Sequence, residues 1–342
     1  MAFAALALSR GERDMPSVPA PIIGEFLRTH HGIDGALRPL VSERDQIVYV
    51  TDEQGRATVL RISSPNEAAE AIALQNALLA AVARQDPSLP VPRILSCRTG
   101  QATGRIAGHV ARLYSFLDGV PVTRTRRSPA LRAALGIALA RLGRALASCD
   151  EPGICDPFPW NVLRACELRA RLDDVRQPAA RALAQRALDD FCGSVLPRLH
   201  AMPHQFIHND FNPKNVLVSI DDPERVSGII DFGDAMRAPR VIDLGVAIAR
   251  QVTQDDPVTE GCEILAAYHG EAPLLADEID LLIGIVRARL AMRVTIWGWR
   301  QASGSGPVDA SLIDDAAGLL ESFERTGRDV VTDRFRAAAA KA

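Results

Sequence analysis

Two short polar clusters, each at the end of an apolar run, constrain this chain more than any other feature. The first lies in Ile207–Val218, which carries His208, Asp210 and Asn215 in the spacing H-x-D-x-x-x-x-N. The second is Asp231, which follows an apolar run that ends in two isoleucines. A turn-forming Asp-Asp-Pro sequence separates the two runs, so we expect a hairpin that brings Asp231 back beside Asn215.

These residue types suit phosphoryl transfer from a nucleotide. Such a transfer needs a carboxylate that orients and deprotonates a hydroxyl group, and oxygen ligands that hold Mg²⁺ against the phosphates. Asp210 fits the first role, while Asn215 and Asp231 fit the second. The alternative is a polar hairpin with two solvated carboxylates, but residue type, order and spacing together favour the catalytic interpretation.

This constellation resembles the catalytic core of the aminoglycoside phosphotransferase and choline kinase-like superfamily, which is distantly related to the protein kinases. Protein kinases carry a lysine two residues after the catalytic aspartate, whereas this chain has Asn212 there, which favours a small-molecule kinase. The resemblance covers about residues 20–326. Further stretches are similar to the hydroxylysine kinase-like branch, namely Ser42–Gln46, Leu74–Leu78, Leu89–Arg93 and Val195–Arg198.

The resemblance implies an α+β fold of the two-lobed protein-kinase-like type, with the active site between the lobes. We expect a small β-rich N-terminal lobe that binds the nucleotide and a larger, mostly helical C-terminal lobe that carries catalysis and the substrate. The expected divisions are a disordered leader over 1–20, the first lobe over 21–118, the second lobe over 119–330 and a flexible tail over 331–342.

Hydrophobic periodicity gives the expected elements within these lobes. Apolar and alternating runs separated by turn residues predict strands over 36–41, 46–51, 57–62, 93–97 and 109–116. Segments rich in alanine and leucine predict helices, of which the longest are expected over 66–84, 129–148, 179–199 and 277–300. The apolar stripe of the last helix is expected to be core.

The resemblance assigns nucleotide contacts to the first lobe. Ser42 lies in the loop that would cover the phosphates, although an ordinary charged turn is an alternative. Arg61 stands where kinase-like proteins place a lysine, and it keeps the positive charge with a different shape. An exposed arginine on an edge strand is the alternative there. Residues 114–117, which include Ser115 and Leu117, form the hinge whose backbone receives the purine in relatives.

The helix after the third strand carries a second departure from the family pattern. Relatives pair the strand lysine with a glutamate of this helix, and Ala73 stands at the expected position here. Glu67 or Glu70 is a candidate substitute. Because both halves of this ion pair are altered, a nucleotide-binding pseudokinase that regulates a partner is an alternative to an active kinase.

Other residues are expected to support the site or contact the substrate. In relatives Asp243 braces the catalytic loop through backbone amides, and we expect His208 to fix the same loop by hydrogen bonding. Asp234 is a candidate for a second metal or for a substrate amine. Trp160 and Asn161 stand where relatives often have Trp-Asp, so this pair is a candidate substrate contact. A tryptophan that fills a helix junction is the alternative.

Composition limits which binding partners and which cellular compartment we expect. With 39 basic and 42 acidic residues and no basic patch with interleaved aromatics, we expect no nucleic-acid partner. The apolar start is too short to span a bilayer and lacks a basic region, and no later run reaches membrane length without a charge. Six scattered cysteines without a C-x-x-C pair indicate buried thiols in a reducing cytoplasm rather than a zinc site.

The sequence therefore predicts a cytoplasmic kinase that uses Mg²⁺ and ATP or GTP. Its acceptor is expected to be a hydroxyl group of an amino acid or amino alcohol, as in a hydroxylysine kinase-like enzyme. An aminoglycoside phosphotransferase is a further alternative, and it would need a strongly acidic acceptor pocket. The acceptor, the choice of nucleotide, the oligomeric state and the start at Met1 or Met15 stay open.

Overall fold

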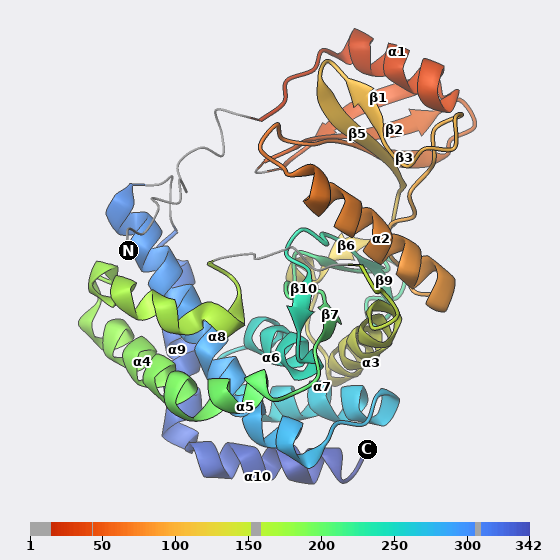
Figure 1. Ribbon diagram of the computed structural model, residues 1–342. Helices are drawn as coiled ribbons and strands as arrows, with labels where there is room; N and C mark the ends of the chain where they lie inside the picture. The colour runs from red at the N-terminus through yellow and green to blue at the C-terminus, as the bar shows by residue number, and fades with distance from the viewer. Residues whose placement is uncertain (1–14, 43, 152–158, 305–308) are drawn as a thin grey trace. The chain divides into compact units, whose positions relative to one another are not determined.

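The computed structural model describes residues 15–42, 44–151, 159–304 and 309–342. Within these residues the chain divides into two compact units. The first unit contains the described residues up to Arg84 together with Val91–Asp118, and the second contains Gln85–Pro90 and the described residues from Gly119 onward. Figure 1 shows that the first unit is rich in strands and the second is mostly helical. The expected α+β fold class is confirmed.

An antiparallel sheet forms the body of the first unit. Asp52 shapes the turn between its second and third strands, because its carboxylate accepts the amides of Gln54 and Arg56 at 3.0 and 2.8 Å. Among the described residues the sheet has five strands in the spatial order β1 (Gly35–Leu40), β2 (Gln46–Asp52), β3 (Ala57–Ile62), β5 (His109–Ser115) and β4 (Gly104–Ile106).

Helix α1 (Ala20–His31) covers one face of this sheet (Figure 1). It starts with a proline in its first turn and ends at Gly32, whose φ of 68° is a conformation that glycine adopts without steric cost. Apolar side chains of α1 and the strands make one core, including Ile23, Phe26, Leu27, Val48, Val50, Leu60, Ile62 and Leu113. Helix α2 (Ala69–Gln85) follows β3 in the chain.

The expected leader over residues 1–20 is wrong for its described part. Residues 1–14 lie outside the described residues. Val18, in contrast, is buried, and the side chain of Gln46 binds both of its backbone groups, at 2.7 Å to the N–H and 2.9 Å to the carbonyl. Residues after Met15 are therefore part of the first unit.

The strand expected over 93–97 is also wrong. This segment contributes only an isolated bridge between Ile94 and Tyr114. Separate backbone bonds join it to β5, such as Leu95 N–H to the Leu113 carbonyl at 2.8 Å. Pro92 precedes the segment and, because proline has no N–H, it contributes no donor to a ladder with β5.

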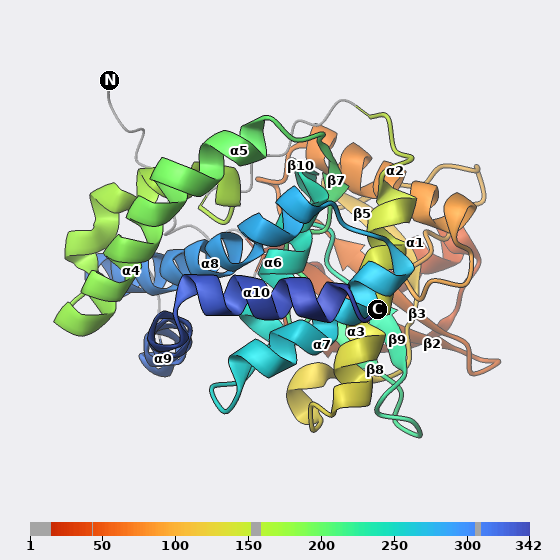
Figure 2. The same cartoon turned by 90° about the horizontal axis from the view of Figure 1, so that it is seen from below.

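The long helix α8 (Ala276–Ser303) is the centre of the second unit and is buried along most of its length. Helix α3 (Pro129–Leu146) packs along α7 (Pro257–Glu271), and Figure 2 shows the two side by side. The elements that pack on α8 are η2 (Val162–Asp174), α4 (Pro178–Asp190), α6 (Arg240–Gln251), α9 (Ser311–Thr326) and α10 (Arg328–Ala339).

Short strands carry the polar loops of the second unit. The hairpin expected between the two polar clusters is present as β8 (Val216–Val218) and β9 (Val226–Ile229). Strand β6 (Val120–Pro121) adds to the β8 side of this hairpin. Strand β7 (Gln205–Ile207), which leads into the first cluster, pairs with β10 (Met236–Ala238).

The helix expected over 179–199 is divided. It consists of α4, a π-helical turn η3 (Phe191–Val195) and the short helix α5 (Leu196–His200). Pro197 lies in the first turn of α5, where its missing N–H costs no helical hydrogen bond. The element that precedes α4, η2, is a 3-10 helix.

The expectation of a flexible tail over 331–342 is wrong. Residues 328–339 form α10, and its Val331 and Phe335 are fully buried. These two residues are four apart, so they lie on one face of the helix. A run of alanines follows these residues, so the sequence pattern did not indicate this short apolar face.

The expectation that all cysteines are free thiols is wrong for two of them. Cys166 of η2 and Cys192 of η3 form a disulfide. Cys97 and Cys149 are free and buried, whereas Cys155 lies outside the described residues. Among the described residues, no helix combines the length and the apolarity that a bilayer crossing requires.

Candidate active site

The loop between β7 and β8 carries the first polar cluster, and Asp243 of α6 fixes its backbone. The two carboxylate oxygens of Asp243 accept the N–H groups of His208 and Asn209, each at 2.8 Å. Asn209 has a φ of 61°, which asparagine tolerates better than most residues. Burial raises the pKa of Asp243, while the two amide hydrogen bonds act in the opposite direction.

His208 joins the two polar clusters. Its Nε2 lies 3.1 Å from the carbonyl oxygen of Ile230, and its Nδ1 lies 3.2 Å from the N–H of Asp210. A carbonyl only accepts and a backbone N–H only donates, so the neutral ring with the proton on Nε2 satisfies both contacts. The ring therefore ties the backbone of Asp210 to the segment that precedes Asp231.

Asp210, Asn215 and Asp231 are brought together as the sequence analysis expected. The side-chain amide of Asn215 donates to Oδ2 of Asp210 at 2.7 Å and to its carbonyl at 3.1 Å. With its nitrogen used in this way, Asn215 has its side-chain oxygen left to ligate a metal. The N–H of Ile230 donates to the Asn215 carbonyl at 2.9 Å, so Asp231 follows a backbone that is paired with Asn215.

Asp231 presents an exposed carboxylate from an unusual backbone conformation. Its φ is 66°, and its Oδ1 accepts the N–H of Gly233 at 3.2 Å. Strained backbone of this kind is often found at functional sites. Together with Asn215 it offers two oxygen ligands, which suits Mg²⁺, because this ion usually keeps several waters and takes substrate phosphates as further ligands.

Arg289 of α8 is a component of the site that the sequence analysis did not single out. Only 3% of its side chain is exposed, and its guanidinium lies 3.8 Å from Oδ1 of Asp210. It also donates to the carbonyls of Trp160 at 2.6 Å and Asn209 at 3.4 Å. Burial lowers the pKa of Arg289, while the charges of Asp210 and Asp234 act in the opposite direction.

Trp160, Asn161 and Asp234 lie in the second unit as well. The Trp160 ring centre is 4.9 Å from the Arg289 guanidinium carbon and 6.0 Å from the ring centre of Trp297. Asn161 caps η2, because its side-chain oxygen accepts the N–H of Leu163 at 2.9 Å. These contacts put Trp160 at a junction between η2 and α8, and a substrate role for the three residues stays a prediction.

A cavity of about 1340 Å³ lies within the second unit. Pro213 and Lys214 of the catalytic loop form part of its wall, and Arg250 and Arg293 line it from α6 and α8. The lining contains seven basic and six acidic residues, so it is not strongly acidic. Burial, together with the charges of Arg293 and Arg289, lowers the pKa of Arg250 to about 9.

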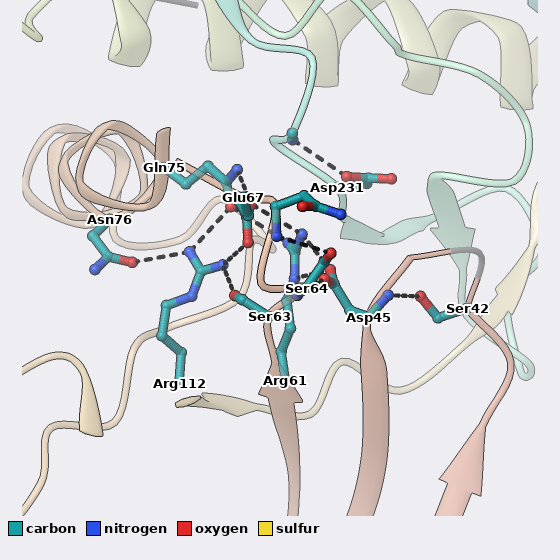
Figure 3. Close-up of polar contacts among 12 residues, drawn as sticks. Ser42, Asp45, Arg61, Ser63, Ser64, Glu67, Gln75, Asn76, Arg112 and Asp231 are labelled. Carbon is teal, nitrogen blue, oxygen red and sulfur yellow. Dashed lines mark hydrogen bonds and ion pairs between the residues drawn. The ribbon is translucent and has the colours of Figure 1, made fainter. Parts of the chain in front are cut away.

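In the first unit, Arg61 is held by two carboxylates (Figure 3). Its Nε donates to Asp45 at 2.6 Å, and its terminal nitrogen lies 3.4 Å from Glu67. Asp45 also accepts the N–H of Ser64 at 2.8 Å, and its own N–H donates to the hydroxyl of Ser42 at 3.3 Å. Through Asp45, these hydrogen bonds connect Ser42, in the loop after β1, to Arg61 of β3.

Glu67 also contacts Arg112, a fully buried arginine of β5 that the sequence analysis did not consider. The two side chains lie 3.4 Å apart, and Arg112 donates to Gln75 at 3.0 Å and to Ser63 at 3.2 Å. Burial would raise the pKa of Glu67, but the charges of Arg61 and Arg112 outweigh it, and the pKa is lowered. Glu67 thus supplies a carboxylate that Ala73 does not.

The residues expected to form the hinge differ in the hydrogen bonds of their backbones. Ser115 exchanges hydrogen bonds with Arg93, since its N–H donates at 2.8 Å and its hydroxyl accepts at 2.9 Å. Phe116 donates to the Ala57 carbonyl at 3.4 Å. Within the described part of the chain, no hydrogen bond of the Leu117 backbone is found, so the purine contact expected of it stays a prediction.

A protein-family model described as "Phosphotransferase enzyme family" matches residues 36–279, more than half of the 342 residues. The chain belongs to the phosphotransferase enzyme family. The expected resemblance and the expectation of a phosphotransferase enzyme are confirmed.

Relatives of this phosphotransferase include hydroxylysine kinases and homoserine kinases. Hydroxylysine kinase of Xenopus laevis is 26% identical over 59% of this chain and 58% of the relative. Hydroxylysine kinase of Danio rerio is 22% identical over 94% of this chain and 95% of the relative. Homoserine kinase of a Methylobacterium species is 32% identical over 57% of this chain and 59% of the relative. The chain thus spans about three fifths of the first and third relatives.

Solved structures confirm the fold of this phosphotransferase. An aminoglycoside phosphotransferase from Alicyclobacillus acidocaldarius aligns with a TM-score of 0.66 at 17% identity, over 97% of this chain and all of the other. Amicoumacin kinase, solved with AMP-PNP, Ca²⁺ and its ligand, aligns with a TM-score of 0.65 at 14% identity, over 92% of this chain and 93% of the other. At these identities the likeness concerns the fold alone.

The sequence of this phosphotransferase contains a weak indication of the buried arginines of α8. Arg289 and Arg293 are four residues apart and, with Arg287, interrupt the apolar stretch over 281–298. A charged pair of this spacing lies on one face of a helix, so it marks either a solvated face or a buried site. Only the packing of α8 against α6 distinguishes the two, and here both side chains are buried.

Proposed function

We propose that this chain is a small-molecule kinase that transfers the γ-phosphoryl group of ATP or GTP to a hydroxyl group of an amino acid or amino alcohol. The observation that carries the proposal is the arrangement of Asp210, Asn215 and Asp231. One asparagine fixes the catalytic carboxylate with its amide nitrogen, offers its oxygen to a metal, and pairs its backbone with the segment before Asp231. The relatives named hydroxylysine kinase and homoserine kinase support a hydroxylated amino acid as acceptor.

Asp210 would orient the acceptor hydroxyl and take its proton. The acceptor oxygen forms a bond to the γ-phosphorus as the bond to the β,γ-bridging oxygen breaks, and the nucleoside diphosphate leaves. Asn215, Arg289 and the His208 contact to its N–H hold Asp210 in one position. Preorganisation of this kind lowers the barrier, because charge is stabilised without reorganisation during the reaction.

Asn215 and Asp231 would hold Mg²⁺, which neutralises phosphate charge when bound. In the first unit, Arg61 would contact the phosphates with two donors of its guanidinium. Ser42 would contribute from the loop that Asp45 fastens to Arg61, and the Leu117 amide and the Ser115 region would receive the purine. Asp234 is proposed for a second metal or for the substrate.

One observation favours a second candidate, a nucleotide-binding pseudokinase. Arg61 is already engaged by Asp45 and Glu67, so a nucleotide would have to share this guanidinium with two carboxylates. The aminoglycoside phosphotransferase alternative is disfavoured, since the cavity in the second unit has about as many basic as acidic residues.

Nucleotide binding and turnover, measured on the same preparation, separate the two candidates. Thermal unfolding is followed with ATP or GTP, with and without Mg²⁺, and release of nucleoside diphosphate is followed with hydroxylated amino acids, amino alcohols and aminoglycosides. The kinase proposal predicts stabilisation that requires Mg²⁺ and release that requires an acceptor. Asp231→Asn should lose both, and Asp277→Asn, at an exposed aspartate of α8, should lose neither. Stabilisation without release by any acceptor would favour the pseudokinase.

A further inference from the structure

We infer that the acceptor carries a carboxylate group and that Arg250 and Arg293, in the cavity of the second unit, bind it. The inference rests on the proposed function and narrows it to hydroxylated amino acids. Amino alcohols and aminoglycosides, which have no carboxylate, are thereby excluded as preferred acceptors.

Arg250 is the first observation. It stands at the end of α6 and lines the cavity. Among the described residues, neither an ion pair nor a hydrogen bond of its side chain is found, and the side chain is partly buried. Its donors are therefore open to the cavity, where an anion can form two charge-assisted hydrogen bonds with the guanidinium.

Arg293 is the second observation. Its side chain is 3% exposed and lines the same cavity from α8. It pairs with Asp315 at 2.8 Å through one terminal nitrogen, while its buried Nε has no hydrogen-bond partner within the described chain. Asp315 is half exposed, so this single ion pair faces water on one side and leaves donors of Arg293 for a ligand.

Two other acids of the cavity are engaged elsewhere. Glu260 pairs with Arg132 at 3.1 Å and accepts the hydroxyl of Thr253 at 3.0 Å. Glu224 accepts the hydroxyl of Ser128 at 2.6 Å. At Arg250 and Arg293, two guanidinium groups thus stand beside one ion-paired carboxylate, that of Asp315, although the whole lining is nearly balanced.

The distance from this wall to the catalytic carboxylate suits a small molecule. Arg293 is one helical turn from Arg289, whose guanidinium lies 3.8 Å from Asp210. Pro213 and Lys214, which line the cavity, belong to the same loop as Asp210. One amino acid could thus place its carboxylate at the two arginines and its hydroxyl group at Asp210.

Matched acceptors test the inference. L-homoserine is compared with 3-aminopropan-1-ol, and 5-hydroxylysine with 1,5-diaminopentan-2-ol, each pair differing only by the carboxylate. Binding to the full chain with Mg²⁺ and a non-hydrolysable nucleotide is measured by calorimetry, so it does not depend on turnover. At least one carboxylate member should bind more tightly than its partner by about 10- to 100-fold, as expected for charge-assisted hydrogen bonds.

Single-residue variants show which arginine produces the preference for the acceptor that carries a carboxylate. Arg250→Gln should remove most of the preference for the carboxylate member and leave nucleotide binding unchanged. Arg293→Gln is a second test of the same wall. Arg126→Gln is the control, because Arg126 lines the cavity but is exposed. Equal affinities within both pairs, no binding of either carboxylate member, or a preference that survives Arg250→Gln would overturn the inference.

The same experiments distinguish an error in the carboxylate site from an error in the proposed kinase function. Phosphoryl transfer to the amino alcohols as fast as to the amino acids would refute the carboxylate site and leave the kinase. Carboxylate-dependent binding without transfer to any acceptor would support the site and remove the kinase. Weaker nucleotide binding in Arg250→Gln would assign this arginine to the phosphates and overturn the inference.

Discussion

Glu67 shows how a single residue compensates for a missing one. Ala73 removes the carboxylate that relatives place on α2, but Glu67, just before that helix, lies 3.4 Å from both Arg61 and Arg112. Asp45 takes the other side of Arg61 at 2.6 Å. Asp45 and Glu67 therefore hold Arg61 where a carboxylate at position 73 is missing. An arginine suits these two partners, because its planar guanidinium can contact two carboxylates at once.

Glu67→Gln should destabilise the protein at pH 7 by about 1–3 kcal/mol, since Arg112 would keep a neutral partner in a buried place. The folded state lowers the pKa of Glu67 below its ordinary value of 4.5. The stabilisation is therefore present above that ordinary value and is lost as pH falls through the lower folded pKa. Urea unfolding at pH 7 and at steps below pH 4 measures it.

Glu70→Gln is the matched control, because Glu70 lies three residues further along, in the first turn of α2, and is exposed. It should change the free energy of unfolding little at any pH. A loss from Glu67→Gln that is as large at the lowest pH as at pH 7 would show that its charge has no part in the effect.

At the scale of elements, the position of α6 matters most, because it carries both Asp243 and Arg250. Gly245 lets α6 approach α8 closely, since a Cβ built there would lie 2.4 Å from a side-chain carbon of Ile285. The same approach brings Arg289 of α8 toward the backbone of Asn209. The contact between these two helices thus sets the geometry of the catalytic loop.

Gly245→Ala should destabilise the protein by about 1–3 kcal/mol and lower turnover, because the added methyl group forces the helices apart. Thermal unfolding and turnover with saturating nucleotide measure the two effects. Gly193→Ala is the control, because a Cβ at this helical position meets nothing within 4 Å. Wild-type stability in Gly245→Ala would contradict the close packing described for α6 and α8.

Helix α10 gives a second prediction at this scale. Phe335→Ala should cost about 3–5 kcal/mol, as expected for loss of a fully buried aromatic ring. Val330→Ala is the control on the same helix, because Val330 is 53% exposed. Denaturant unfolding of both variants distinguishes a packed helix from a dispensable tail, and a neutral Phe335→Ala would support the tail.

At the scale of the whole molecule, the sequence predicted what local patterns encode. His208, Asp210, Asn215 and Asp231 lie within 24 residues, so a loop and one hairpin suffice to bring them together. Strands β1, β2, β3 and β5 of the first unit followed from alternating runs between turn residues, whereas β4 did not. The family pattern added Asp243, whose two amide contacts the structure describes.

Features that depend on packing between distant segments could not be predicted. Arg289 meets Asp210 only because α8 crosses the catalytic loop, about 80 residues away in the chain. The Cys166–Cys192 disulfide likewise depends on how η2 meets η3. The polar cluster of the first unit also needs Arg112 of β5, which no local pattern marks, beside the Glu67 that the sequence offered as one of two candidates.

The most direct test of the central claim is product analysis by mass spectrometry. Wild type, Asp210→Asn and the exposed control Asp173→Asn are incubated with Mg²⁺, ATP or GTP and the hydroxylated amino acids. We predict a phosphorylated amino acid with wild type and Asp173→Asn, and a rate lower by about 10²–10⁴-fold with Asp210→Asn at unchanged fold. Wild-type product formation by Asp210→Asn would contradict the role assigned to this carboxylate.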